Sequence, residues 1–207
     1  MSEVKLISIT PDAEKTMMYC ARVSNPANQS SENSKLIEYC IKHGHWSIFE
    51  MANIIVEIET SRAISAQILR HRSFCFQEFS QRYAKVASNE TYEARSQDPK
   101  NRQNSVDNMS DDDKKWFKTA QEHIHDTSEE LYTEALNKGI AKEQARFLLP
   151  MSSSSKLYMN GTVRSWIHYL NLRTSNGTQL EHIEIANKIK DVFIKELPVV
   201  SKALGWV

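Results

Sequence analysis

The arginines are unevenly distributed along the chain. Five of the ten lie between Arg62 and Arg95, whereas most lysines are scattered elsewhere. An arginine guanidinium presents a planar fork of donors that fits phosphate or carboxylate in a bidentate manner, whereas a lysine acts as a point charge. The sequence therefore predicts an anion-binding site centred on residues 70–83, which read RHRSFCFQEFSQRY.

Three polar side chains of this segment are spaced two residues apart. If the chain is extended after Arg72, then Glu78, Ser80 and Arg82 project to one face and offer an acceptor, a hydroxyl and a cation. Such a row could bind a polar ring and its phosphate. A salt-bridged surface strand is the structural alternative. A second alternative is a single-stranded nucleic-acid-binding module, because aromatic residues alternate with the arginines as they do on base-stacking surfaces.

The composition restricts how a nucleotide can be held. The chain has 207 residues, 40% of them hydrophobic, with 26 basic and 26 acidic side chains, and this neutral balance weighs against nucleic-acid binding. It has only five glycines, and the closest two are sixteen residues apart. A dinucleotide-binding fingerprint and a P-loop both need glycines close together. Any nucleotide must therefore be held mainly by side chains.

The cysteines and the N-terminal residues indicate the compartment. Cys20, Cys40 and Cys75 are odd in number and lack C-x-x-C spacing, which argues against a zinc ribbon and a secreted disulfide framework. We predict no metal site and a reducing compartment. The first fifteen residues lack a signal-peptide pattern, and no stretch is long enough to span a bilayer. The expected location is the cytoplasm, with no membrane partner.

Helix and strand patterns alternate in the first half of the chain. Thr10-Pro11-Asp12 predicts a helix that extends to about residue 23, and a second apolar stripe ends at Gly44. Residues 54–59 alternate as in a strand, and Ser61 can cap a short helix that carries Arg70-His71-Arg72 at its end. Residues 88–110 are polar and predict a long surface loop, which could act as a lid.

The second half of the chain is predominantly helical in pattern. Ser110 and Asp113 start a long helix ending at Gly139, whose apolar stripe is predicted to pack into the core. A short segment, 141–149, precedes a strand near residues 157–159 and a helix over 163–172. Thr178 and Glu181 form a capping box for a last helix. No linker divides the chain, so residues 1–207 are predicted to form one α+β domain.

Residues 70–82 carry an ordered motif. They resemble the R-H-R-x-x-S-x-N-x-x-S-x-R motif of the flavin-dependent thymidylate synthases, the ThyX family, with Cys75 and Gln77 replacing its first Ser and its Asn. Three further segments resemble elements of that family in the same order. Residues 42–50 (KHGHWSIFE) resemble K-H-G-H-x-[ST]-P-F-E, residues 145–150 (ARFLLP) resemble A-R-x-x-L-P, and residues 164–173 (RSWIHYLNLR) resemble a helix with R-S and L-x-L-R.

The resemblance implies a fold and a reaction. The expected fold is a small, mainly antiparallel sheet flanked by several helices, and the expected assembly is a homotetramer with active sites between subunits. The reaction would be reductive methylation of dUMP to dTMP, with methylenetetrahydrofolate as carbon donor, NADPH as reductant and FAD carrying the hydride. FAD and dUMP both bring phosphate groups, which is compatible with the concentration of arginine.

The resemblance also implies three sets of site residues. Arg173 would polarise the uracil, Ser80 would hold the substrate close to the chemistry, and His45 would lie near the flavin. The residues expected around FAD are Ser47, Glu50, Arg70, His71, Arg72, Gln77, Glu78, Thr162, Arg164 and His168. The residues expected to hold dUMP are Gln67, Arg70, Glu78, Ser80, Gln81, Arg82, Arg146 and Arg173.

Other reactive side chains have simpler interpretations. The family does not need an enzyme thiolate for methylation, so Cys75 is predicted to be a buried, inert thiol. His123 and His125 lie two apart on a helix, share no face, and are predicted to be surface residues. His182, in the first turn of the last helix, is predicted to be solvated.

Overall fold

A four-stranded antiparallel sheet forms the centre of the molecule. In this computed structural model, which describes residues 2–31, 33–84, 89–175 and 177–207, the strand order is β1 (Glu3–Ile9), β2 (Asn53–Ser61), β6 (Ser154–Thr162) and β3 (Cys75–Glu78). The register of the central pair runs from Asn53 opposite Thr162 to Ser61 opposite Ser154. Strand β1 has no counterpart among the predicted elements, because its alternating stretch is short and directly precedes the helix-start residues.

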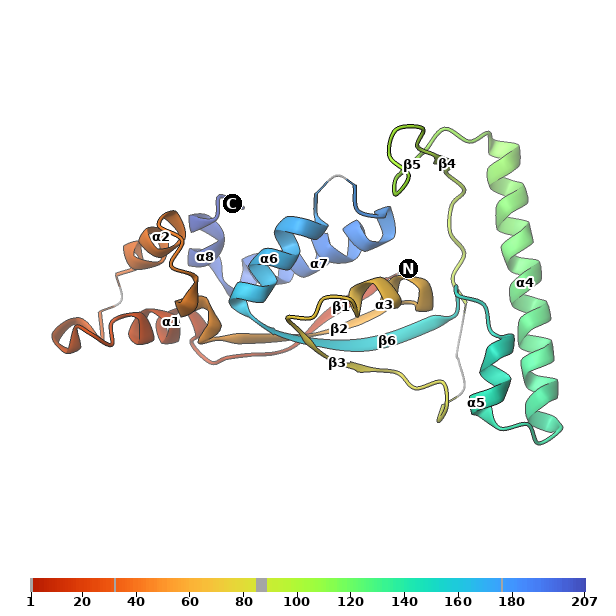
Figure 1. Cartoon of the computed structure of the whole chain (residues 1–207), viewed down its shortest axis with the longest axis horizontal. Coiled ribbons are helices and arrows are strands. Elements are labelled where there is room, and N and C mark those ends of the chain that lie inside the picture. The colour runs from red at the N-terminus through yellow and green to blue at the C-terminus, as the bar shows by residue number, and fades with distance from the viewer. Residues whose placement is uncertain (1, 32, 85–88, 176) are drawn as a thin grey trace.

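Helices cover one face of this sheet. Helices α3 (Arg62–Ile68), α6 (Val163–Arg173) and α7 (Leu180–Glu196) lie on the same side in Figure 1, and α3, α6 and α7 all contact strands of the sheet. The side chains that β2 and β6 direct toward them, including Val56, Ile58, Leu157 and Met159, are fully buried. The intervening residues form a polar face, where Lys156 pairs with Glu57 and Glu59.

Smaller elements close one end of the sheet. Helices α1 (Ala13–Ala21), α2 (Lys35–Lys42) and α8 (Pro198–Ala203) gather there in Figure 1, with the short 3-10 helices η1 (Pro26–Asn28) and η2 (Trp46–Glu50). Helix α1 begins after Asp12, which adopts a left-handed conformation. The predicted start, with Thr10 as the cap and Pro11 as the first helical residue, is therefore two residues early.

One glycine is required by packing between β6 and the loop before β3. A Cβ atom built on Gly161 would lie 2.4 Å from a ring carbon of Phe74. Phe74 in turn meets Trp166 and Tyr169 of α6 in edge-to-face contacts. The absence of a side chain at Gly161 thus lets the chain carrying the arginine cluster lie directly against the α6 aromatic residues.

The long helix α4 (Asp111–Asn137) stands beside the sheet with α5 (Lys142–Ala145) and the 3-10 helix η3 (Arg146–Leu148) (Figure 1). Its N-cap is Ser110, which accepts a hydrogen bond from Asp113 N as predicted. The prediction that its apolar stripe packs into the core is wrong for most of its length. Trp116, Ile124 and Leu131 are exposed, with 69% of the Trp116 surface accessible.

The polar segment before α4 is more structured than predicted. Residue 88 lies outside the described residues, and the remainder contains the paired strands β4 (Ser96–Gln97) and β5 (Ser105–Val106). The Asp98 carboxylate accepts hydrogen bonds from the backbone of Lys100 and Asn101 and from the amide of Asn104. The predicted α+β class, with a small antiparallel sheet flanked by helices, is confirmed.

Candidate active site

Arg173 and His71 are joined by a hydrogen bond on the helical side of the sheet. The Nε atom of Arg173, at the end of α6, donates a hydrogen bond to Nε2 of His71 over 2.9 Å. His71 accepts this bond only with Nε2 unprotonated. Burial, with the charges of Arg173, His168 and Arg70, lowers the pKa of His71 to about 4. A neutral imidazole therefore holds the guanidinium and leaves its two terminal amino groups for a ligand.

A second buried histidine supports this pair. His182 is fully buried and lies 3.0 Å from the hydroxyl of Tyr169, whose ring packs edge-to-face on His71. Burial, with the charges of Arg173 and His71, lowers the pKa of His182 to about 3. The prediction that His182 is solvated is wrong, because the first turn of α7 faces α6 and buries the ring.

Glu78 lies at the end of β3 beneath α3. Its carboxylate accepts hydrogen bonds from Ser65 and Ser155 and forms an ion pair with Arg62 at 2.7 Å. Gln77 and Cys75 alternate with Glu78 and Phe76 and therefore project to the opposite face of the sheet. Gln77 and Glu78, both expected around FAD, therefore lie on opposite faces of the sheet in one subunit.

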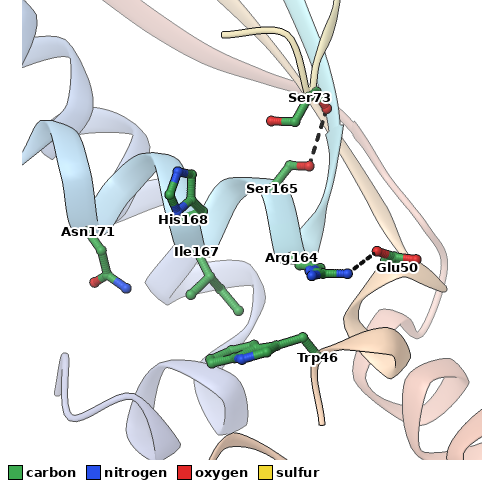
Figure 2. A pocket seen from close by; sticks show the side chains of 8 residues that line it. All are labelled: Trp46, Glu50, Ser73, Arg164, Ser165, Ile167, His168 and Asn171. Atoms are coloured by element: carbon green, nitrogen blue, oxygen red, sulfur yellow. Dashed lines mark hydrogen bonds and ion pairs between the residues drawn. The ribbon is translucent and has the colours of Figure 1, made fainter. Parts of the chain in front are cut away.

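A cavity of about 540 Å³ opens between α6 and η2. It is lined by Trp46, Glu50, Ser73, Arg164, Ser165, Ile167, His168 and Asn171 (Figure 2). The Arg164 guanidinium meets the Glu50 carboxylate at 2.5 Å, and the Ser165 hydroxyl donates to the carbonyl of Ser73. Glu50, Arg164 and His168, three of the residues expected around FAD, thus come together.

The predicted arginines divide into two groups. Arg70 and Arg173 lie at the C-terminal ends of α3 and α6, whereas Arg82 pairs with Glu143 of α5 at 3.2 Å, and Arg146 stacks on Phe147 nearby. The described residues show no hydrogen bond or ion pair between the two groups. Helix α5 lies next to α4 in Figure 1, away from α6.

The chain between the two groups is not extended as predicted. After Glu78 only the Phe79 amide continues the pairing, with the Lys156 carbonyl as acceptor. The Tyr83 amide then donates to the Ser80 carbonyl, which closes a turn over residues 80–83. Ser80 and Arg82 therefore do not share a strand face with Glu78, and Gln81 is buried within this turn.

The remaining predicted residues have clear positions. His45 and Ser47 are exposed at the start of η2, Arg72 is exposed after α3, and Gln67 lies in the last turn of α3. Thr162 caps α6 and accepts a hydrogen bond from the Ser165 amide. Thr162 serves the helix that carries the cavity-lining side chains, and it does not itself line the cavity.

Two further predictions about reactive side chains are wrong. Cys75 is exposed, because β3 turns it to the polar face of the sheet. His125 is buried against the segment before β6, where Nε2 lies 2.7 Å from the Ser152 hydroxyl. Among the described residues, no group of three or more His, Cys, Asp or Glu is arranged to hold a metal ion.

Comparison with known proteins gives the family. A family model described as thymidylate synthase complementing protein matches residues 5–199. The probable flavin-dependent thymidylate synthase of Paramecium bursaria Chlorella virus 1 is 56% identical, over 98% of this chain and 99% of its own length. The chain belongs to the flavin-dependent thymidylate synthase family.

Other members of the flavin-dependent thymidylate synthase family support this assignment. The enzyme of Synechocystis sp. is 53% identical over 93% of this chain and 90% of its own length. Among solved structures, a UMP/dUMP methylase from Streptomyces cacaoi bound with 5-Br dUMP has a TM-score of 0.85 at 25% identity. The match covers 99% of this chain and 95% of the methylase chain. A second structure of the methylase, bound with 5-Br UMP, gives 0.84 at 26% identity.

Family membership confirms the resemblance drawn from the four ordered motifs, and it favours an enzyme over a nucleic-acid-binding module. The described helices include none that is long and apolar enough to cross a membrane. Trp46 and Asn171 also line the cavity but are absent from the predicted site residues, although both lie inside the four motifs. Both could have been predicted from their positions, because each lies within one turn of predicted site residues on η2 or α6.

Proposed function

We propose that this protein converts dUMP to dTMP by reductive methylation, with FAD as cofactor, NADPH as reductant and methylenetetrahydrofolate as carbon donor. The observation that carries the proposal is the Arg173–His71 hydrogen bond, beside a cavity lined by Arg164 and His168. Support comes from the family and from a solved structure of similar fold whose protein is a UMP/dUMP methylase bound with 5-Br dUMP.

Arg173 would act on the pyrimidine. A guanidinium fixed beside N3 and O2 of uracil stabilises negative charge on the ring and makes its C5 position more electron-rich. Because His71 is neutral and accepts from Nε, Arg173 keeps its charge and its orientation. Ser80 and Gln81 would contact the nucleotide, and the remaining substrate residues would be Gln67, Arg70, Glu78, Arg82 and Arg146.

The residues of the cavity fit a flavin. The volume lies within the range of small-molecule sites, and the lining combines an aromatic ring, Trp46, with the cation Arg164 and the imidazole of His168. When bound, FAD would supply hydride chemistry, which protein side chains lack. Trp46 and Ile167 would contact its apolar surface, and Arg164 would orient its polar part (Figure 2). Ser47, Arg70, His71, Arg72, Gln77, Glu78 and Thr162 complete the proposed FAD set, with His45 near the flavin.

The separation of the two arginine groups supports a homotetramer. If Arg82 and Arg146 of one subunit complete the site formed by Arg70 and Arg173 of another, each active site lies between subunits. The exposed stripe on α4, which includes Trp116 and Leu131, supplies apolar surface for such contacts. We further propose that residues 1–207 form a single catalytic domain and that the protein works in the cytoplasm.

The direct test is product formation. Purified protein is incubated anaerobically with dUMP, FAD, NADPH and methylenetetrahydrofolate, and dTMP is separated by chromatography. The proposal predicts dTMP only when all four are present, and at least about 10²-fold less dTMP from Arg173→Ala protein that still folds. Equal product without flavin or without the folate would contradict it.

A further inference from the structure

A continuous chain of hydrogen bonds joins the segment before α4 to Gln67. The amide nitrogen of Gln67 donates to Oε1 of Gln179 over 2.6 Å, and the amide nitrogen of Gln179 donates to Oε2 of Glu181 over 2.8 Å. The other carboxylate oxygen of Glu181 accepts from Arg95 at 2.5 Å, and Arg95 Nε donates to Ser105 over 2.9 Å. Helix α3, the start of α7 and strand β5 are thereby connected through Arg95, the residue before β4.

The ion pair at the centre of this chain is largely removed from solvent. Only 12% of the Arg95 side chain and 8% of the Glu181 side chain are exposed. Burial alone would raise the pKa of Glu181, but the hydrogen bonds from Arg95 and Gln179 outweigh it and lower the pKa. Glu181 therefore stays ionised, and an ionised carboxylate only accepts hydrogen bonds.

That restriction fixes the direction of both amides. Because Glu181 cannot donate, Gln179 must turn its NH2 group toward the carboxylate and its carbonyl oxygen toward Gln67. Gln67 must then turn its own NH2 group toward Gln179. Its carbonyl oxygen is left pointing away from the relay, as an acceptor.

We propose that Arg95 and Glu181 are positioning residues that make Gln67 present a carbonyl acceptor to a donor group of the nucleotide, such as a ribose hydroxyl or a ring N–H. This inference rests on the proposed function, in which Gln67 contacts dUMP. The capping box predicted for Thr178 and Glu181 is wrong, because the Glu181 carboxylate bonds to Arg95 and Gln179. The structure instead has Gln179 as the N-cap of α7, without a side-chain cap bond.

Two single variants test the relay. Both leave an oxygen at position 181 that can accept a hydrogen bond from the buried Arg95 guanidinium. Glu181→Gln keeps the shape but adds a donor, so the amides of Gln179 and Gln67 are no longer held in one direction. Gln179→Ala removes the link and leaves the Arg95–Glu181 ion pair in place. Binding of dUMP to the flavin-loaded protein is measured by calorimetry, and kcat and KM for dUMP are measured separately.

We expect each variant to bind dUMP about tenfold more weakly, with KM raised and with kcat at saturating dUMP and flavin content nearly unchanged. The double variant should be little weaker than either single one, because both cut the same chain. A purely structural role would lower the melting temperature without this split between KM and kcat.

The matched control is Lys114→Met. Lys114 ties the same segment to α4 through Glu93 and Asp107, but it takes no part in the relay. Its dUMP affinity should equal that of the unaltered protein. Unaltered affinity in both Glu181→Gln and Gln179→Ala would overturn the relay. Failure of the unaltered protein to bind dUMP would overturn the proposed function instead, and the relay with it.

Discussion

The guanidinium of Arg173 is held by a neutral histidine, His71, through a 2.9 Å hydrogen bond from Nε to Nε2. A carboxylate in the position of His71 would neutralise the cation, whereas an imidazole fixes it without removing its charge. The fixed charge then acts on whatever ligand meets the terminal amino groups. The chemistry proposed for this protein depends on that arrangement.

Replacing Arg173 separates substrate activation from flavin binding. Arg173→Ala removes the only group assigned to stabilise negative charge on the uracil, so dTMP formation should fall by at least about 10²-fold. Arg173 does not line the cavity, so the flavin content should stay near that of the unaltered protein. Product formation and the flavin absorption of the purified variant check the two parts. Full turnover by Arg173→Ala would show that Arg173 does not stabilise negative charge on the uracil.

The buried histidines make stability depend on pH. In the folded protein the pKa values of His71 and His182 are lowered to about 4 and about 3, whereas unfolded histidine titrates near 6.5. The unfolded chain therefore binds more protons as the pH falls below about 6.5, and stability is lost from there down toward pH 4 and 3.

His182→Gln, which never carries a charge and can still bond to Tyr169, should show a shallower loss over the same window. Urea unfolding at a series of pH values measures this difference. Identical slopes for the variant and the unaltered protein between pH 6.5 and 4 would show that His182 does not titrate as described.

We expect the exposed thiol of Cys75 to be dispensable for the reaction. Cys75→Ser changes one atom on the polar face of the sheet, opposite Glu78, so kcat/KM for dUMP should stay within about twofold of the unaltered value. Steady-state kinetics measure it. Loss of methylation in a folded, flavin-containing Cys75→Ser protein would instead indicate a thiolate nucleophile.

We expect the ion pair of Arg164 and Glu50 to contribute more to flavin binding than to stability. Both side chains are about half exposed, and exposed pairs contribute at most about 1 kcal/mol to the free energy of unfolding. Arg164→Ala should therefore weaken flavin binding by about tenfold while the melting temperature changes little. Lys138→Ala, which breaks another exposed pair with Glu134 outside the cavity, is the control and should leave both quantities unchanged. Tight flavin binding by Arg164→Ala would argue against this cavity as the flavin site.

The apolar stripe on α4 is predicted to be covered in the assembled protein. The double variant Trp116→Glu, Leu131→Glu places two charges on that stripe and should lower the molecular mass measured by light scattering. Because both side chains are exposed in the single chain, folding should persist by circular dichroism. An unchanged mass would show that this stripe is not an interface.

The local patterns of the sequence predicted much of the fold. The alternation over residues 54–59 and the Ser110 cap both led to elements that the structure contains. Contacts between distant segments were not predictable, because a local pattern does not say which face meets which. The burial of His182 depends on α7 packing against α6, and the exposure of Cys75 depends on which side of β3 meets the helices.

The same limit applies to the site. Motif spacing identified Arg164, His168 and Glu50, which the structure brings to one cavity. Spacing could not reveal that Arg173 bonds to His71, 102 positions earlier in the chain, or that Arg95 reaches Glu181. Nor could it separate Arg82 and Arg146 from the first group, because that separation follows from the position of α5 beside α4.

Whether flavin and dUMP share one site is tested most directly by the visible absorption spectrum of the purified protein, before and after anaerobic NADPH, with and without dUMP. We expect a bound oxidised flavin that is bleached by NADPH at a rate that dUMP alters, because both ligands share one site. A protein that shows no flavin, even after FAD is added, would contradict this expectation.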